Sequence, residues 1–159
     1  MPDTPASLSA KLSYEGEKTL TFFSNLRSEQ LERIVYSEGD SWSVRQILAH
    51  FVSAEIAFLE LITDVIAGGK GAPEGFDIDT FNHSEVTALQ GLHASDLIDQ
   101  FHQIRHQTVR IVAKIKPEQL NQTARHPFLG VAPLADIIRL IYRHNQIHLR
   151  DIRSAIGPK

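Results

Sequence analysis

Apolar side chains recur at intervals of three and four residues along most of this chain, which is the spacing of one face of an α-helix. Alternation typical of strands is nearly absent, and residues 125–130 are expected to form a loop. A short helical turn is expected at residues 28–34. The pattern predicts an all-α four-helix bundle, with long helices at residues 4–26, 43–67, 95–116 and 133–157.

Two histidines in the last predicted helix, His144 and His148, lie four residues apart. Residues at this spacing lie one above the other on the same helix face, so both imidazoles can bind one divalent metal ion. His148 falls within the apolar arc of its helix, and His144 falls at the edge of that arc. His50 lies at the edge of the apolar stripe of the helix predicted at residues 43–67. These three histidines are the candidate metal ligands.

The depth of these histidines along their helices predicts how the bundle is connected. His50 lies about 10 Å from the start of its helix, and His148 lies about 13 Å from the end of the last helix. The two levels match if these helices run antiparallel, which requires an up-down-down-up bundle with a long crossover between helices 2 and 3. The only connection long enough is residues 68–94, in which a short helix is expected at residues 80–89.

The other histidines show no comparable signal. His102 and His106 share the four-residue spacing, but they project about 125° and 165° away from the centre of their apolar face, so we expect them to be exposed to solvent. His83, His93 and His126 lie in connections without a spacing pattern. No functional role is assigned to these five residues.

Composition and charge limit the classes of protein to which the chain can belong. Its 159 residues are enough for one domain with a core, and we expect residues 1–159 to form a single helical-bundle domain. The net charge is −3 without a basic cluster, which predicts no nucleic-acid partner. The absence of cysteine excludes disulfides and thiolate ligands from this chain. Without an apolar signal segment or a membrane span, we expect a cytoplasmic protein that does not bind membranes.

The segment Trp42–His50 (WSVRQILAH), the His144–His148 pair and the long second crossover together resemble the DinB-like superfamily of helical bundles. The resemblance covers essentially the whole chain. It implies an up-down-down-up bundle that binds a divalent metal, often nickel or zinc, through His50, His144 and His148. For activity, it implies one of two reaction classes on a small-molecule substrate. The first is transfer or isomerisation with a low-molecular-weight thiol cofactor, and the second is metal-dependent hydrolysis. It also implies a homodimer.

Three neutral imidazoles leave coordination positions open on a divalent ion, as in catalytic metal sites. Glu15 and Glu55 are the candidate catalytic acid–base residues, because Glu15 projects into an apolar helix face and Glu55 lies just over one turn beyond His50. Asn145 projects into the apolar face of the last helix and is a candidate either for binding cofactor or substrate or for bridging helices by hydrogen bonds. Imidazole ligands suit nickel, zinc, iron and copper alike, so the residues do not select the metal.

Two other functions fit the same residues. The first is a non-catalytic stress-response module in which the histidines hold a ligand or a structural metal. The second is an interaction domain that dimerises through a helix face, in which the histidines are incidental. The metal-dependent hydrolase or thiol transferase is the preferred hypothesis, because three imidazoles leave coordination positions open to water or substrate.

Overall fold

The computed structural model describes residues 2–157, and most of them are helical. The connections contain α2 (Ser28–Leu31), α4 (Ile78–Ala88) and the 3-10 helix η1 (Pro117–Asn121). None of the helices in these residues is both long and apolar enough to cross a lipid bilayer. The predicted helix ends lie within about three residues of the observed ones, and the four long helices are α1 (Pro5–Ser24), α3 (Val44–Ile66), α5 (Ala94–Ala113) and α6 (Leu134–Ile156).

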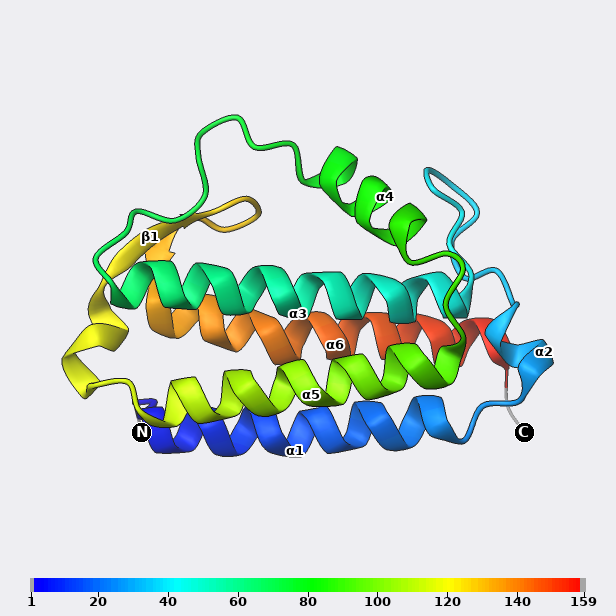
Figure 1. Cartoon of the computed structure of the whole chain (residues 1–159), viewed down its shortest axis with the longest axis horizontal. Coiled ribbons are helices and arrows are strands. Elements are labelled where there is room, and N and C mark those ends of the chain that lie inside the picture. The colour runs from blue at the N-terminus through cyan, green and yellow to red at the C-terminus, as the bar shows by residue number, and fades with distance from the viewer. Residues whose placement is uncertain (1, 158–159) are drawn as a thin grey trace.

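The four long helices form the predicted up-down-down-up bundle. α1 and α6 run in one direction, and α3 and α5 run in the other (Figure 1). α1 packs against α5 and α6, and α3 packs against the same two helices. The predicted arrangement is confirmed, and α3 and α6 are therefore antiparallel neighbours.

Side-chain caps fix the starts of two of these helices. The Ser43 hydroxyl accepts a hydrogen bond from the backbone N–H of Gln46, and the Gln46 side chain accepts one from the backbone N–H of Ser43. Thr4 and Ser7 form the same reciprocal pair at the start of α1. These capping boxes satisfy N–H groups that have no partner within the helix. The cap at Ser43 places His50 about two turns into α3.

The loop expected at residues 125–130 is wrong in part, because its two ends belong to a small β-hairpin. β1 (Thr123–His126) and β2 (Gly130–Pro133) form an antiparallel hairpin. Each strand has only four residues, which is too short for an alternating pattern to stand out in the sequence. Gly130 closes the turn at φ +72°, a conformation that costs glycine little.

The crossover between α3 and α5 is attached to this hairpin. The backbone N–H of Ala72 donates to the carbonyl of Arg125 at 2.8 Å, and the N–H of Arg125 donates to the carbonyl of Lys70 at 2.9 Å. Gly71 lies between these bonds at φ +85°, and an added Cβ would lie 2.4 Å from the Arg125 carbonyl oxygen. α4 then packs along α3 (Figure 1). The crossover and the hairpin therefore cover the bundle on the side of α3.

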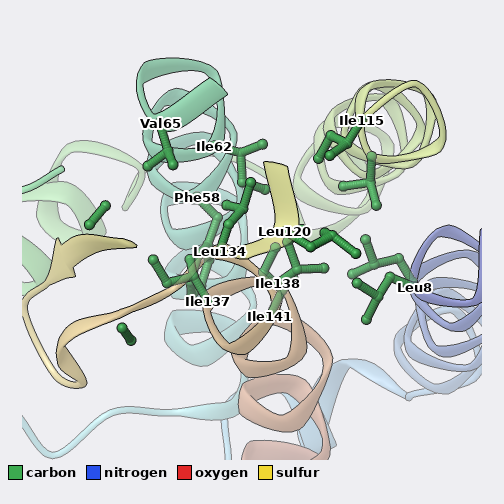
Figure 2. Packing of buried hydrophobic residues seen from close by; sticks show 14 of the residues in the cluster. Leu8, Phe58, Ile62, Val65, Ile115, Leu120, Leu134, Ile137, Ile138 and Ile141 are labelled. Atoms are coloured by element: carbon green, nitrogen blue, oxygen red, sulfur yellow. The ribbon is translucent and has the colours of Figure 1, made fainter. Parts of the chain in front are cut away.

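The interior of the bundle has two apolar clusters with a polar layer between them. The cluster near the hairpin includes Phe58 of α3 and Ile138 of α6 (Figure 2). The cluster at the other end includes Phe51 and Phe101. Between the two clusters each long helix buries one charged or amide residue, and these residues are Glu15, Glu55, Arg105 and Asn145.

Candidate metal centre

The three histidines singled out in the sequence lie together between α3 and α6. Nε2 of His144 lies 2.8 Å from Nε2 of His50 and 3.1 Å from Nε2 of His148. The ligand nitrogens of the three rings all lie within 4.8 Å of one another. Two nitrogens bound to one zinc ion at about 2.0 to 2.1 Å would be about 3 to 3.4 Å apart. The spacing of the rings is therefore close to that of metal ligands.

Burial keeps these imidazoles neutral. Desolvation, with a smaller contribution from His148, lowers the pKa of His50 to about 3. Desolvation and then the charges of the other two rings lower the pKa of His144 well below 6.5. Desolvation also lowers the pKa of His148, against the opposing effect of Asp151. Because a neutral imidazole has a lone pair for a cation and a protonated one does not, the site presents usable donors at pH 7.

A hydrogen-bonded chain behind His148 fixes the tautomer of that ring. The hydroxyl of Tyr36 donates to Oδ2 of Asp151 at 2.7 Å, and Nδ1 of His148 lies 2.7 Å from the same hydroxyl oxygen. Burial and then Asp151 raise the pKa of Tyr36 above its ordinary value, so the hydroxyl keeps its proton. Nδ1 of His148 is therefore the N–H donor, which leaves the lone pair on Nε2. Hydrogen bonds of this kind orient histidines that bind metals.

Sequence reasoning missed both partners of His148. Asp151 lies three residues after His148 on α6, a spacing that places the two on one helix face, so this signal was available. Tyr36 comes from irregular chain between α2 and α3, where no period predicts direction.

His50 is held by ring packing, and its second ring nitrogen, Nδ1, is buried and makes no hydrogen bond within the described residues. The ring of Trp42 lies 4.9 Å from the His50 ring, measured between centroids. Trp42 is the only tryptophan in the sequence, so its fluorescence reports on this site.

The histidines form part of the wall of a pocket of about 690 Å³. Residues of α3 and α6 line the pocket together with the crossover, α4 and the turn of the hairpin. Small-molecule sites commonly have volumes of about 300 to 1,000 Å³ and mainly apolar walls. The lining here is mainly apolar, and its aromatic residues are Trp42, Phe58, Phe76, Phe81 and Phe128. A small organic molecule therefore fits within reach of the histidines.

Glu15, Glu55 and Asn145 belong to the buried polar layer and not to the lining of this pocket. Arg105 donates to both carboxylate oxygens of Glu55, at 2.9 and 2.6 Å, and to Oδ1 of Asn145 at 2.6 Å. Glu15 forms ion pairs of 3.5 and 3.7 Å with two lysines of its own helix. The catalytic and binding roles expected of these residues stay predictions, and their contacts favour structural roles.

The remaining histidines divide into two groups. His102 and His106 are exposed on α5, as their projection predicted. His83 and His93 are also exposed. His126, to which no role was assigned, lies on β1 and lines the pocket that contains the three convergent histidines. The sequence offered no signal for His126 because the hairpin that positions it was not predicted.

The chain belongs to the DinB superfamily, whose family model matches residues 11–152. This match confirms the resemblance based on the Trp42–His50 segment and the His144–His148 pair. A search of curated proteins finds no match.

Solved structures with the same fold have diverse descriptions. YfiT from Bacillus subtilis, described as a probable metal-dependent hydrolase with an unusual four-helix bundle topology, superposes with a TM-score of 0.76 at 15% identity, over 93% of this chain and 83% of YfiT. A mycothiol-dependent maleylpyruvate isomerase has a TM-score of 0.76 at 12% identity, over 96% of this chain and 61% of the isomerase. An uncharacterised protein from Escherichia coli UTI89 also has a TM-score of 0.76, at 12% identity over 98% and 94% of the two chains. At these identities the similarity shows the fold alone.

One of these structures corrects an expectation drawn from charge. The colibactin self-resistance protein ClbS superposes with a TM-score of 0.73 at 10% identity, over 99% of both chains, and was crystallised in complex with double-stranded DNA. The expectation that this protein has no nucleic-acid partner is therefore wrong, because net charge does not exclude such a partner for this fold. Net charge is a property of the whole chain, whereas binding depends on the local surface, so a charge of −3 does not rule out a DNA-binding member of this fold.

Proposed function

We propose that this protein is a metal-dependent enzyme that binds one divalent cation through His50, His144 and His148 and acts on a small organic molecule. The observation that supports the proposal is the convergence of three neutral Nε2 donors on a pocket large enough for a substrate. Structural metal sites are usually closed by four protein ligands. Within residues 2–157 the group contains these three histidines and no further ligand, so water or substrate can complete the coordination.

The donor set suits nickel or zinc, and it also accepts iron or copper. A divalent ion held there would lower the pKa of a water molecule or of a thiol and would polarise a carbonyl group. The protein's own residues prepare the site for this chemistry. Tyr36 and Asp151 hold the His148 ring with its lone pair on Nε2. His50 is buried and His144 and His148 are half-buried, and this partial removal from water strengthens electrostatic interactions at the site.

Two reaction classes are consistent with this site, namely hydrolysis and transfer of a low-molecular-weight thiol. The descriptions of YfiT as a metal-dependent hydrolase and of the isomerase as mycothiol-dependent support one class each. A thiol would have to come from a cofactor, because the chain has no cysteine.

Elemental analysis of protein purified without a histidine tag tests the metal centre. We expect about one divalent ion per chain in the wild type and less than about a tenth of that in His148→Ala, because two remaining imidazoles hold an ion weakly. The matched control is the double variant His102→Ala/His106→Ala, which removes an exposed pair with the same spacing. Metal content that is unchanged in His148→Ala would exclude the proposed centre.

Activity screens then distinguish an enzyme from a binding module. The substrates are activated esters and electrophiles supplied with small thiols, each tested with metal-loaded and metal-stripped protein. We expect turnover in one of these classes that requires metal, disappears in His148→Ala and persists in the double control. Stoichiometric metal without turnover in either class favours the non-catalytic binding module.

A further inference from the structure

A fourth histidine lines the pocket that contains the proposed metal centre. His126 belongs to β1 and is 9% exposed. Its ring stacks on Phe58 of α3, with centroids 5.5 Å apart and ring planes 13° apart. It is not a member of the three-histidine group. Its position is therefore well defined, and the proposed metal centre does not use it.

Hydrogen bonds from the turn of the hairpin fix the tautomer of His126. The backbone N–H groups of Phe128 and Leu129 donate to its Nδ1 at 3.0 and 3.3 Å. A ring nitrogen that accepts these bonds carries no proton. Burial lowers the pKa of His126, which keeps the ring neutral at pH 7. The single ring proton is therefore on Nε2.

The Nε2–H group of His126 is available to a ligand. No hydrogen bond joins Nε2 to another residue in the described range 2–157, and Nε2 is not among the polar atoms that the fold seals from solvent. Because His126 lines the pocket and its Nε2–H is not sealed from solvent, a ligand in the pocket can reach this donor. A largely buried donor gains free energy when an acceptor from a ligand or water completes its hydrogen bond. His126 thus offers a directional donor without a positive charge.

The charges around the pocket disfavour anionic ligands. Among its described lining residues, none is lysine or arginine, whereas Glu60, Asp64 and Asp79 supply carboxylates. Oδ2 of Asp64 accepts a hydrogen bond from the N–H of Gly71 at 3.0 Å, and Glu60 and Asp79 are exposed. In the metal-free protein, an anion would lose hydration in this apolar pocket without gaining a cationic side chain as counter-ion. A neutral, mainly apolar molecule loses much less.

We infer that the pocket binds neutral, largely apolar carbonyl compounds, such as ketones, esters or amides, and that Nε2–H of His126 donates a hydrogen bond to the carbonyl oxygen. The inference rests on the proposed function only in taking this pocket as the substrate site. An ammonium group finds no acceptor at His126, and a carboxylate meets negative charge nearby. His126 is accordingly a residue that selects the substrate by its carbonyl group.

A set of ligands of nearly equal size tests this preference. Benzylacetone is a neutral ketone, hydrocinnamate replaces its methyl ketone with a carboxylate, the corresponding primary amine is cationic, and butylbenzene lacks the oxygen. Binding is followed by the fluorescence of Trp42, which lines the pocket, and is checked by calorimetry. With metal-stripped protein, we expect the ketone to bind at least about tenfold more tightly than the carboxylate or the amine, because each charged group loses more hydration.

Two substitutions separate the donor of His126 from its structural role. His126→Asn keeps an acceptor near the position of Nδ1 and removes the Nε2–H donor, whereas His126→Gln keeps an amide N–H near Nε2 and removes the acceptor for the turn. We expect the Kd of benzylacetone to rise about threefold to tenfold in His126→Asn, the range of one net hydrogen bond. The Kd of butylbenzene should be unchanged, and His126→Gln should recover most of the ketone affinity.

Each outcome decides the inference. Tighter binding of the carboxylate or the amine than of the ketone overturns it, and so does an unchanged ketone Kd in His126→Asn. If butylbenzene binding is also lost in His126→Asn, the pocket has collapsed, and ketone affinity in His126→Gln decides: retention supports the donor and loss overturns it.

Repeating the titrations with metal-free His148→Ala separates this inference from the proposed function. If the wild type also takes up no metal while the ketone preference persists, the proposed metal centre is refuted and this inference stands. Metal uptake without a ketone preference refutes the inference alone.

Discussion

Removal of the Tyr36 hydroxyl should weaken metal binding while leaving the bundle intact. In Tyr36→Phe, Nδ1–H of His148 loses its acceptor at 2.7 Å, and the ring is free to adopt the tautomer with its proton on Nε2. That proton would occupy the lone pair needed for the metal. Loss of an outer partner of this kind costs about 10- to 100-fold in metal affinity, or about 1.4 to 2.7 kcal/mol. The phenyl ring retains the edge contact with His148, whose centroid lies 5.9 Å away, so packing changes little.

The assay is a competition titration of zinc or nickel between a chromophoric chelator and metal-stripped protein. Asp151→Asn provides a graded comparison, because its amide oxygen still accepts from Tyr36 but the charge is gone, so we expect a loss smaller than in Tyr36→Phe. Tyr14→Phe is the matched control, since Tyr14 is 61% exposed. Equal metal affinity of Tyr36→Phe and wild type would refute the argument that this hydroxyl orients the ligand.

Three further predictions concern stability, measured as the free energy of unfolding in urea. Glu55→Ala should lower it by about 3 to 5 kcal/mol, because the buried guanidinium of Arg105 loses its carboxylate; a loss below about 1 kcal/mol would contradict the structural role of this ion pair. Gly71→Ala should lower the free energy of unfolding by about 1 to 3 kcal/mol more than Gly75→Ala. Both glycines have positive φ, but an added Cβ meets backbone atoms only at Gly71. Equal losses in the two variants would contradict this. The stability of metal-free protein should fall as pH decreases from 6.5 toward about 3, because within this window the unfolded chain binds a proton at His50 that the folded chain excludes. The slope is about 1.4 kcal/mol per pH unit for each such histidine, and a pH-independent stability would show that these rings are not held neutral by burial.

The helices and the three convergent histidines could be predicted because both depend on regular geometry. A period of 3.6 residues assigns each side chain a direction, and a rise of 1.5 Å assigns it a depth. His50, His144 and His148 were found by matching these two quantities between helices. The long connection after α3 then allowed only one arrangement of the bundle that brings them together.

The residues that shape the pocket around those histidines had no such regularity. Tyr36 reaches His148 from irregular chain, and His126 depends on a hairpin whose strands have four residues each. Glu55 was singled out by its spacing from His50, yet spacing along one helix does not identify a partner on another helix. Its pairing with Arg105, 50 residues later in the chain, is a long-range contact between two helices.

Local periodicity in the sequence thus determined that this chain forms four amphipathic helices and that three imidazoles face their common interior, because both follow from the repeat of a single helix. Only the tertiary structure decided which of the interior polar groups neutralise one another, which hydrogen bonds set each histidine tautomer, and which connections close the pocket. Those features arise from contacts between segments distant in sequence, and no repeat within one segment encodes them.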